Sequence, residues 1–392
     1  MKILVAWEMP DAALDDLRTL GCDVVSIPDA AGAAFLHELR EATALVIGRT
    51  PLPADAIAAA KSLQIIVRCG SEASNIAIDE ASTQGVFVCT TPHRTALAVA
   101  EMMLGMMLTL DRQLVWKKGE SGPTTLPHGL AGRTLGLLGY SHAGRALARR
   151  AAALEMNVLA WSPTETPESL RGEPVSLCTW SRDVARQSDV IAVHADPADG
   201  EDMLLDAEFI QGIREGADVV FVGHPGGLDE SALESAIKSR RLRVAIDWIG
   251  AERARETARS RSRLADLPTV LMTVGLAERT MQARVAVAAE AVRVLRQFFV
   301  SGAVENCINL LSRSPATWQL VLRLRDAVGV MAGIMDAIRS DGINAEEIGT
   351  RVFVGARAAW CTIAVDERPS TEALAAIRAL PGVLHLELRA VV

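Results

Sequence analysis

Apolar runs and amphipathic stretches alternate along the first third of the chain. Each short apolar run is followed by a stretch in which apolar residues recur at helical spacing. The predicted strands cover residues 2–7, 22–27, 44–49, 63–70 and 86–91. Strands and helices that alternate at this spacing indicate a parallel sheet with helices on both faces. The next stretch, 95–114, is apolar nearly all round, so we expect a helix buried between domains or in a dimer interface.

A second alternating region begins at Thr134. Its predicted strands cover residues 135–138, 157–162, 190–195, 218–223, 243–248 and 269–274. The helix predicted over 281–300 returns to the first sheet, so we expect a flavodoxin-like domain of residues 1–96 and 281–310. The residues between these segments, 97–280, are expected to form a Rossmann domain.

The last part of the chain follows a different order of elements. After a polar linker near 311–319, residues 320–392 read as β-α-β-β-α-β, which is typical of a ferredoxin-like domain. The predicted fold class is therefore α/β, with two Rossmann-like doubly wound parallel sheets and a C-terminal ferredoxin-like domain.

Composition narrows the classes of partner. The 392 residues carry a formal net charge of −8, which disfavours broad binding to nucleic acid or to anionic membranes. The N-terminus lacks the basic and long apolar regions of a signal peptide, so we expect a cytoplasmic protein. The six cysteines are scattered without metal-ligand spacing, so we expect buried thiols and no metal site.

One glycine-containing turn carries candidate chemistry. The apolar run 135–138 leads into Gly139-Tyr140-Ser141-His142-Ala143-Gly144, and a helical stretch follows. A dinucleotide fold offers such a turn to a pyrophosphate, usually as G-x-G-x-x-G, but here the middle glycine is Ser141. The next strand ends at Ser162, where an acidic residue would select NAD, and only carboxylates follow where NADP would need arginine. The turn can still accept NAD or NADP, with weakened binding and neither selectivity element.

Three long stretches carry a family resemblance. Residues 67–101, 132–163 and 188–248 resemble the D-2-hydroxyacid dehydrogenases, most closely the D-3-phosphoglycerate dehydrogenases that end in an ACT regulatory domain. The resemblance implies hydride transfer between a 2-hydroxy acid and a nicotinamide. That reaction uses an arginine for the substrate carboxylate, a histidine as base and a glutamate that raises the pKa of the histidine. The matching positions here hold Pro225, Gly275 and Glu252, so we expect the standard reaction to be lost.

The resemblance also assigns binding positions. It implies cofactor contacts at Gly139, Ser141, His142, Gly144, Ser162, His194 and Asp247, and Asp247 is the position that accepts the nicotinamide carboxamide. It implies substrate contacts at Arg49, Gly70, Ser71 and Glu72, where the Glu72 carboxylate would repel an anion. Arg49 is either an anion ligand or a charge at a domain edge. His224 is either a relocated acid/base or a cap at a strand end.

The C-terminal domain resembles an ACT domain. By that resemblance, Asp326 and Asn344 would contact an amino-acid effector at a dimer interface. The alternative is that this domain serves dimerisation only. We expect a small-molecule ligand and a homodimer formed through the 95–114 region.

Three functions remain open. The first is a catalytically degenerate homologue that binds a dinucleotide or nothing and serves as an assembly or regulatory subunit. The loss of selectivity at the cofactor and substrate ends of the cleft favours this function. The second is an NAD(P)-dependent oxidoreductase or other enzyme whose rebuilt cleft takes a non-standard, amine-bearing substrate, with Glu252 and His224 as its catalytic residues. The third is an amino-acid sensor that works through the ACT-like domain.

Overall fold

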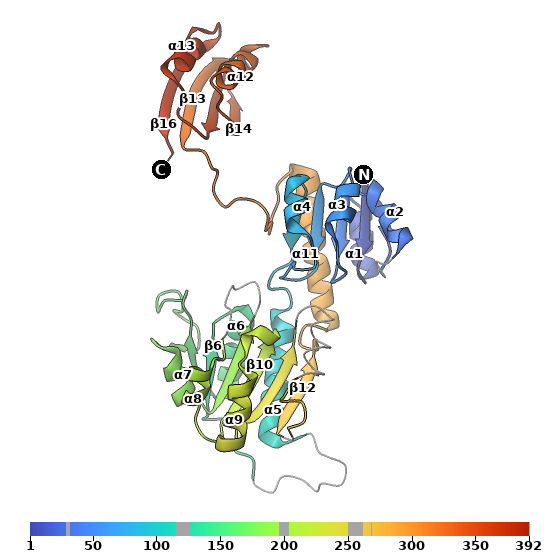
Figure 1. Cartoon of the computed structure of the whole chain (residues 1–392), viewed down its shortest axis with the longest axis vertical. Coiled ribbons are helices and arrows are strands. Elements are labelled where there is room, and N and C mark those ends of the chain that lie inside the picture. The colour runs from blue at the N-terminus through green and yellow to red at the C-terminus, as the bar shows by residue number, and fades with distance from the viewer. Residues whose placement is uncertain (29–31, 115–125, 196–203, 250–261, 268, 392) are drawn as a thin grey trace. The chain divides into compact units, whose positions relative to one another are not determined.

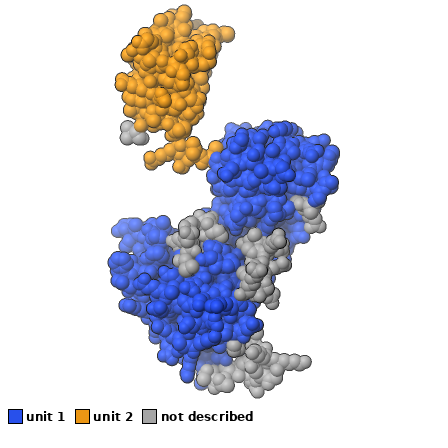
Figure 2. Space-filling model, in the orientation of Figure 1, with its two compact units in different colours: residues 1–309 blue, residues 310–392 orange. Residues whose placement is uncertain are grey.

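The structure, a computed structural model, describes residues 1–28, 32–114, 126–195, 204–249, 262–267 and 269–391 (Figure 1). The chain forms two compact units, residues 1–309 and residues 310–392 (Figure 2).

The first sheet is built from the N-terminal strands. They are β1 (Lys2–Ala6), β2 (Asp23–Ser26), β3 (Ala44–Ile47), β4 (Ile65–Arg68) and β5 (Phe87–Thr90). The strands are parallel and lie in the order β2-β1-β3-β4-β5. Strands β3 and β4 are buried over their whole length, because helices cover both faces of the sheet.

Helices fill two cores around this sheet. One core contains apolar residues of α1 (Asp11–Arg18) and of the long helix α11 (Met281–Ser301). The other contains residues of α2 (Ala33–Glu41), α3 (Ala54–Ala59) and α4 (Ile78–Thr83). The C-terminal part of the first unit therefore supplies a helix to the N-terminal sheet, as the sequence pattern predicts.

The second sheet has seven parallel strands. They are β6 (Thr134–Leu138), β7 (Asn157–Trp161), β8 (Ser176–Leu177), β9 (Val190–Ala195), β10 (Asp218–Gly223), β11 (Arg243–Trp248) and β12 (Val270–Val274). Their order is β12-β11-β10-β9-β6-β7-β8. Helices α5 (Ala96–Arg112) and α6 (His142–Ala153) contribute to one core, and α7 (Ser181–Gln187), α8 (Ala207–Gly212) and α9 (Glu230–Arg240) to the other.

The second unit has one antiparallel sheet. Its elements are β13 (Trp318–Arg325), α12 (Val330–Ser340), β14 (Ala345–Val352), β15 (Ala358–Val365), α13 (Thr371–Ala379) and β16 (Val383–Ala390). The strand order is β14-β15-β13-β16, with residues of both helices in the core. The predicted fold class is confirmed: two parallel sheets precede an antiparallel ACT-like unit. Among the described helices, none has the length and apolar character needed to span a bilayer.

Candidate functional site

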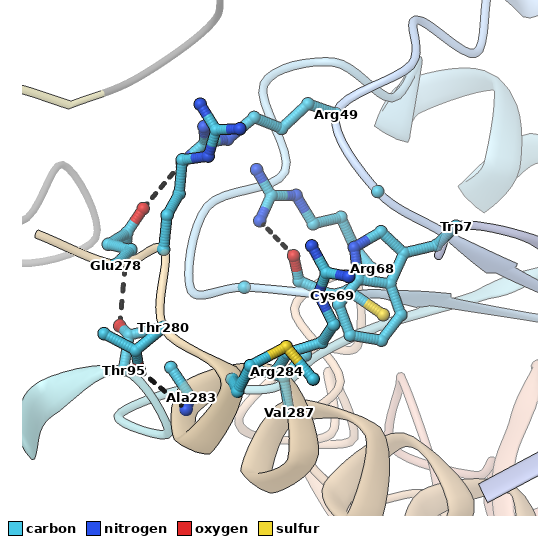
Figure 3. A pocket seen from close by; sticks show the side chains of 14 residues that line it. Trp7, Arg49, Arg68, Cys69, Thr95, Glu278, Thr280, Ala283, Arg284 and Val287 are labelled. Atoms are coloured by element: carbon cyan, nitrogen blue, oxygen red, sulfur yellow. Dashed lines mark hydrogen bonds and ion pairs between the residues drawn. The ribbon is translucent and has the colours of Figure 1, made fainter. Parts of the chain in front are cut away.

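A pocket lies at the carboxyl edge of the first sheet. The strand order reverses between β1 and β3, and open α/β sheets bind ligands outside the carboxyl ends of strands at such a point. Trp7 directly follows β1, whereas Gly48 and Arg49 follow β3, and all three line the pocket (Figure 3). A Cβ at Gly48 would lie 2.7 Å from Trp7 Cδ1, so glycine makes room for the indole ring. The fold places Arg49 where a ligand of this sheet would be expected.

The pocket lining is strongly cationic. Four arginines and one carboxylate line it, which gives four positive charges, one negative charge and a net charge of +3. These residues are Arg49, Arg68, Arg279, Arg284 and Glu278. The N-terminus of the 21-residue helix α11 is also at the pocket, where Thr280 Oγ1 accepts a hydrogen bond from the Ala283 N–H at 3.0 Å. Guanidinium groups and a helix N-terminus both attract anions.

Arg68 is the most buried cation of this pocket. It is 7% exposed and ends β4, where its Nη1 donates to the Cys69 carbonyl at 2.6 Å and its Nε to Asn75 Oδ1 at 3.4 Å. Within the described residues, no carboxylate forms an ion pair with it. Burial and, second to it, the neighbouring Arg49 charge lower the pKa of Arg68. A buried guanidinium without a counter-ion is costly, and a bound anion would remove that cost.

The local backbone is shaped around this guanidinium. Gly70 has a φ of +133°, and a Cβ there would lie 1.7 Å from Arg68 Nη1. Asn75 Nδ2 donates to the carbonyls of Gly48 at 3.2 Å and Thr50 at 2.7 Å, which fastens the loop after β4 to the loop after β3. The loop that holds Arg68 and the loop that carries Arg49 therefore share one fixed geometry.

The one carboxylate of the lining is already engaged. Glu278 Oε2 accepts from Arg49 Nη2 at 2.6 Å, and its Oε1 accepts from Thr95 Oγ1 at 3.3 Å (Figure 3). The sequence reasoning missed Glu278, Arg68 and Arg284. Arg68 had a signal, since a charged residue ends an otherwise apolar strand, but we find no sequence signal for the pairing of Glu278 with Arg49.

The other predicted substrate-side residues are used differently. The Gly70 N–H donates to Thr91 Oγ1 at 2.7 Å, which occupies an amide that the resemblance assigns to an anion. The carboxylate of Glu72 accepts from Ser74 Oγ, and its charge acts on Arg68 by raising the pKa of that guanidinium. Of these described residues, Ser71 and Glu72 are not part of the pocket lining, whereas Gly70 is.

The second sheet has its own switch point, between β6 and β9. Ser141 follows β6 and caps α6, with its Oγ accepting from the Gly144 N–H at 3.3 Å. The same Oγ lies 3.2 Å from Nδ1 of His194, near the end of β9. Gly139 has a φ of +84° and no atom within 4 Å of a would-be Cβ. The structure therefore brings the predicted turn and His194 together at the expected edge.

A second imidazole contact lies beside this turn. The rings of His142 and His93 stack with centroids 3.7 Å apart and planes 17° apart. His93 has a φ of +64°, an uncommon conformation for a residue with a Cβ. The segment between β5 and α5 thereby contacts the start of α6.

An arginine at the expected ribose end comes from helix α6, which the sequence reasoning did not anticipate. Arg145 of α6 pairs with Glu165 at 2.9 Å and with Glu173 at 3.2 Å, and its guanidinium lies 4.7 Å from the centre of the Tyr140 ring. Ser162 Oγ lies 3.2 Å from Thr164 Oγ1. Of the carboxylates that follow Ser162, Glu165 is thus paired with an arginine of helix α6, a pairing that spacing in sequence does not show.

The positions where the family resemblance places catalytic groups lie at the same sheet. Pro225 opens a short 3-10 helix after β10, preceded by the half-buried His224, and Gly275 follows β12 with a φ of +62°. Asp247 in β11 is fully buried, where its oxygens accept from Thr273 Oγ1 and from the N–H groups of residues 276 and 277. Its nicotinamide role stays a prediction. Glu252 lies outside the described residues.

The predicted effector residues of the second unit are both exposed. The Asp326 N–H donates to the Arg357 carbonyl at 3.2 Å, and Asn344 Nδ2 donates to Glu346 Oε1 at 2.6 Å. Their effector role also stays a prediction. Within the described part of the chain, no group of three or more histidine, cysteine or acidic side chains could hold a metal ion.

Comparisons with known proteins show which family and which relatives this chain resembles. Residues 100–277 match the family described as D-isomer specific 2-hydroxyacid dehydrogenase, NAD binding domain. A hydroxypyruvate reductase of Thermotoga maritima is 31% identical over 247 residues, covering 61% of this chain and 79% of the relative. A D-3-phosphoglycerate dehydrogenase of Archaeoglobus fulgidus is 28% identical over 344 residues, covering 85% of this chain and 64% of the relative. The chain thus spans less than two thirds of the length of that dehydrogenase.

Solved structures share the fold. The NAD+-bound 3-phosphoglycerate dehydrogenase of Entamoeba histolytica superposes with a TM-score of 0.64 at 20% identity, over 79% of this chain and 99% of that one. At this identity the likeness concerns the fold alone.

Proposed function

Because the chain belongs to the D-isomer specific 2-hydroxyacid dehydrogenase family, we propose that it is a non-catalytic member that binds a small, multiply charged anion. The anion is held by Arg49 and Arg68, and the protein serves as a regulatory or assembly subunit. The ACT-like C-terminal unit supports the regulatory role, with an amino-acid effector at Asp326 and Asn344 as its candidate signal.

The observation that carries the proposal is the buried charge of Arg68. Arg68 is 7% exposed and forms no ion pair with a described carboxylate, and the nearby charges of Glu72 and Glu278 compensate its burial only in part. An anion with two charged groups would pair with Arg68 and Arg49 together, since both side chains line the same pocket. The net charge of +3 in the lining favours such a ligand over a neutral one.

The expected loss of dehydrogenase chemistry rests on two positions. Proline has no charge to hold a substrate carboxylate, and glycine has no group to accept a proton, so Pro225 and Gly275 cannot do what the family resemblance requires. Loss of a general base alone costs about 100- to 10,000-fold in rate.

The glycine turn supports a retained dinucleotide. NAD or NADP would be held at Gly139, Ser141, His142 and Gly144, where a pyrophosphate fits beside the N-terminus of the 12-residue helix α6. A bound dinucleotide would supply a nicotinamide able to exchange a hydride. Arg145, once released from Glu165, could pair with a ribose 2′-phosphate, whereas Glu165 could accept from ribose hydroxyls, so both cofactors remain candidates.

D-3-phosphoglycerate is a suitable probe, because it carries a phosphate and a carboxylate and gives several relatives their name. We expect saturable binding in calorimetry and a loss of about tenfold or more in affinity for Arg49→Gln, which removes a charged hydrogen-bond donor. A matched control is Arg18→Gln, since Arg18 is an exposed arginine that pairs with Asp15 outside the pocket. Absent binding, or equal binding by both variants, would refute the anion pocket.

A second candidate function is an enzyme with a rebuilt cleft. It is favoured by the position of His224, which directly follows β10 and precedes Pro225. Reduction of NAD+ or NADP+ by any 2-hydroxy or 2-amino acid would favour this enzyme over the non-catalytic subunit, provided that His224→Ala abolishes the reaction.

A further inference from the structure

We propose that the Glu278 carboxylate is an internal counter-ion of the pocket, which holds Arg49 until an anionic ligand displaces it. The inference rests on the proposed function, because it assumes that the pocket takes an anion. It adds that the affinity for that anion is set by competition with a residue of the protein itself.

The geometry of Glu278 is that of a bound carboxylate. Its Oε2 lies 2.6 Å from Arg49 Nη2, and its Oε1 accepts from Thr95 Oγ1 at 3.3 Å. Figure 3 shows Glu278 between these two side chains at the pocket. A ligand carboxylate or phosphate that pairs with Arg49 at Nη2 would take the donor that Glu278 now uses, so ligand and Glu278 compete for the same guanidinium.

The position of Glu278 in the chain explains how it reaches both partners. It lies between β12 and α11, the connection that returns the chain to the first sheet. Thr95 lies between β5 and α5, the connection that leaves that sheet, and Arg49 follows β3. One carboxylate therefore joins the two connecting segments to the edge of the first sheet.

The two central arginines of the pocket differ in their partners. Arg49 is paired with Glu278, and the pair is 30% and 22% exposed, so solvent screens it only in part. Arg68 is more deeply buried and, among described residues, has carbonyl and amide partners only. A first anionic group can pair with Arg68 without competition, whereas a second group at Arg49 competes with Glu278. Glu278 thus lowers the affinity for doubly charged ligands.

The chain offers a matched control in Glu8. Its carboxylate also pairs with a pocket arginine, Arg284, at 3.0 Å. Both partners are more exposed, at 67% for Glu8 and 41% for Arg284, so water weakens this pair. Glu8 is also not part of the described lining.

The test is calorimetric titration of the full chain with D-3-phosphoglycerate. We expect Glu278→Gln to tighten binding by about tenfold, because the ligand no longer displaces a charged hydrogen bond. We expect Glu278→Ala to tighten it similarly and Glu8→Gln to change it by about twofold or less. Thermal denaturation of each variant checks that the fold is kept.

The outcomes separate this inference from the proposed function. Unchanged or weaker binding by both Glu278 variants would overturn the inference while leaving the anion pocket intact, since Glu278 would then be a positioning residue for Arg49. Absence of binding in the wild type and in all variants would overturn the proposed function, and the inference with it. Equal tightening in Glu8→Gln would show a general charge effect and overturn the competition.

Discussion

Replacement of Arg68 by methionine separates the contribution of this residue to folding from its contribution to binding. Methionine keeps most of the aliphatic length and removes the charge. The substitution loses the hydrogen bond to the Cys69 carbonyl at 2.6 Å and the longer one to Asn75 at 3.4 Å. The two lost hydrogen bonds lower the free energy of unfolding by about 1–2 kcal/mol together. Removal of a poorly compensated buried charge raises it by at least as much.

The expected net effect of Arg68→Met is a free energy of unfolding that is unchanged or raised by up to about 2 kcal/mol. The affinity for D-3-phosphoglycerate should fall by about tenfold or more. Scanning calorimetry without ligand measures the change in the free energy of unfolding. Each kcal/mol corresponds to a shift of about 2–4 °C in the denaturation midpoint.

Arg133→Met is the matched control for this experiment. Arg133 is also largely buried, but it pairs with Asp111 at 3.3 Å and with Asp218 at 3.1 Å, and both carboxylates are fully buried. Its removal should cost about 2–3 kcal/mol, because each buried carboxylate loses one of its two arginine partners, while Arg112 remains at Asp111 and Arg243 at Asp218. A loss of about 2 kcal/mol or more for Arg68→Met as well would refute the reasoning that Arg68 is kept for a ligand.

Three further outcomes follow from the same structure. Gly70→Ala should destabilise the first sheet by about 2 kcal/mol, because a side chain is strained at a φ of +133°. It should also abolish anion binding, because its Cβ, 1.7 Å from Arg68 Nη1, would push the guanidinium out of place; ligand calorimetry and thermal denaturation check both effects. Burial raises the pKa of Cys69 to about 12, so its thiol should resist iodoacetamide at about pH 8, and peptide mapping should find it unmodified in the native protein. The Arg293 guanidinium lowers the pKa of the Glu290 carboxyl in the folded protein. The Glu290 carboxylate therefore stabilises the fold at pH values above its unfolded pKa of about 4.3. This stabilisation is lost as the pH falls through the lowered pKa of the folded state. Glu290→Gln should therefore cost about 2 kcal/mol at about pH 7, with the difference vanishing in acid in urea denaturation; an unchanged difference would contradict the assignment.

The elements could be predicted from the sequence because their apolar patterns are dictated by burial. The runs 44–49 and 63–70 contain β3 and β4, and the apolar stretch 281–300 is helix α11. The turn with Ser141 could be found for a similar reason, since its residues are adjacent in the chain and its spacing is fixed by the strand and helix it joins.

The pocket could not be predicted in the same way. Arg49 and Glu278 are 229 residues apart, and their meeting depends on the strand order and on the return of α11 to the first sheet. The burial of Arg68 likewise depends on packing around the end of β4. Spacing in sequence also did not reveal that Arg145 pairs with Glu165, because Arg145 lies in α6 and Glu165 in the segment after β7.

The central claim is that this chain binds a doubly charged anion without the hydride transfer of its family. The most direct test is one titration of the wild-type protein with D-3-phosphoglycerate in the presence of NAD+, recording heat and the absorbance of reduced nicotinamide together. The account predicts saturable heat of binding and no reduced nicotinamide. Turnover at a rate typical of dehydrogenases, about 1 per second or faster, would contradict the account. Absence of binding at millimolar ligand would also contradict it, since this means a binding free energy weaker than about 4 kcal/mol.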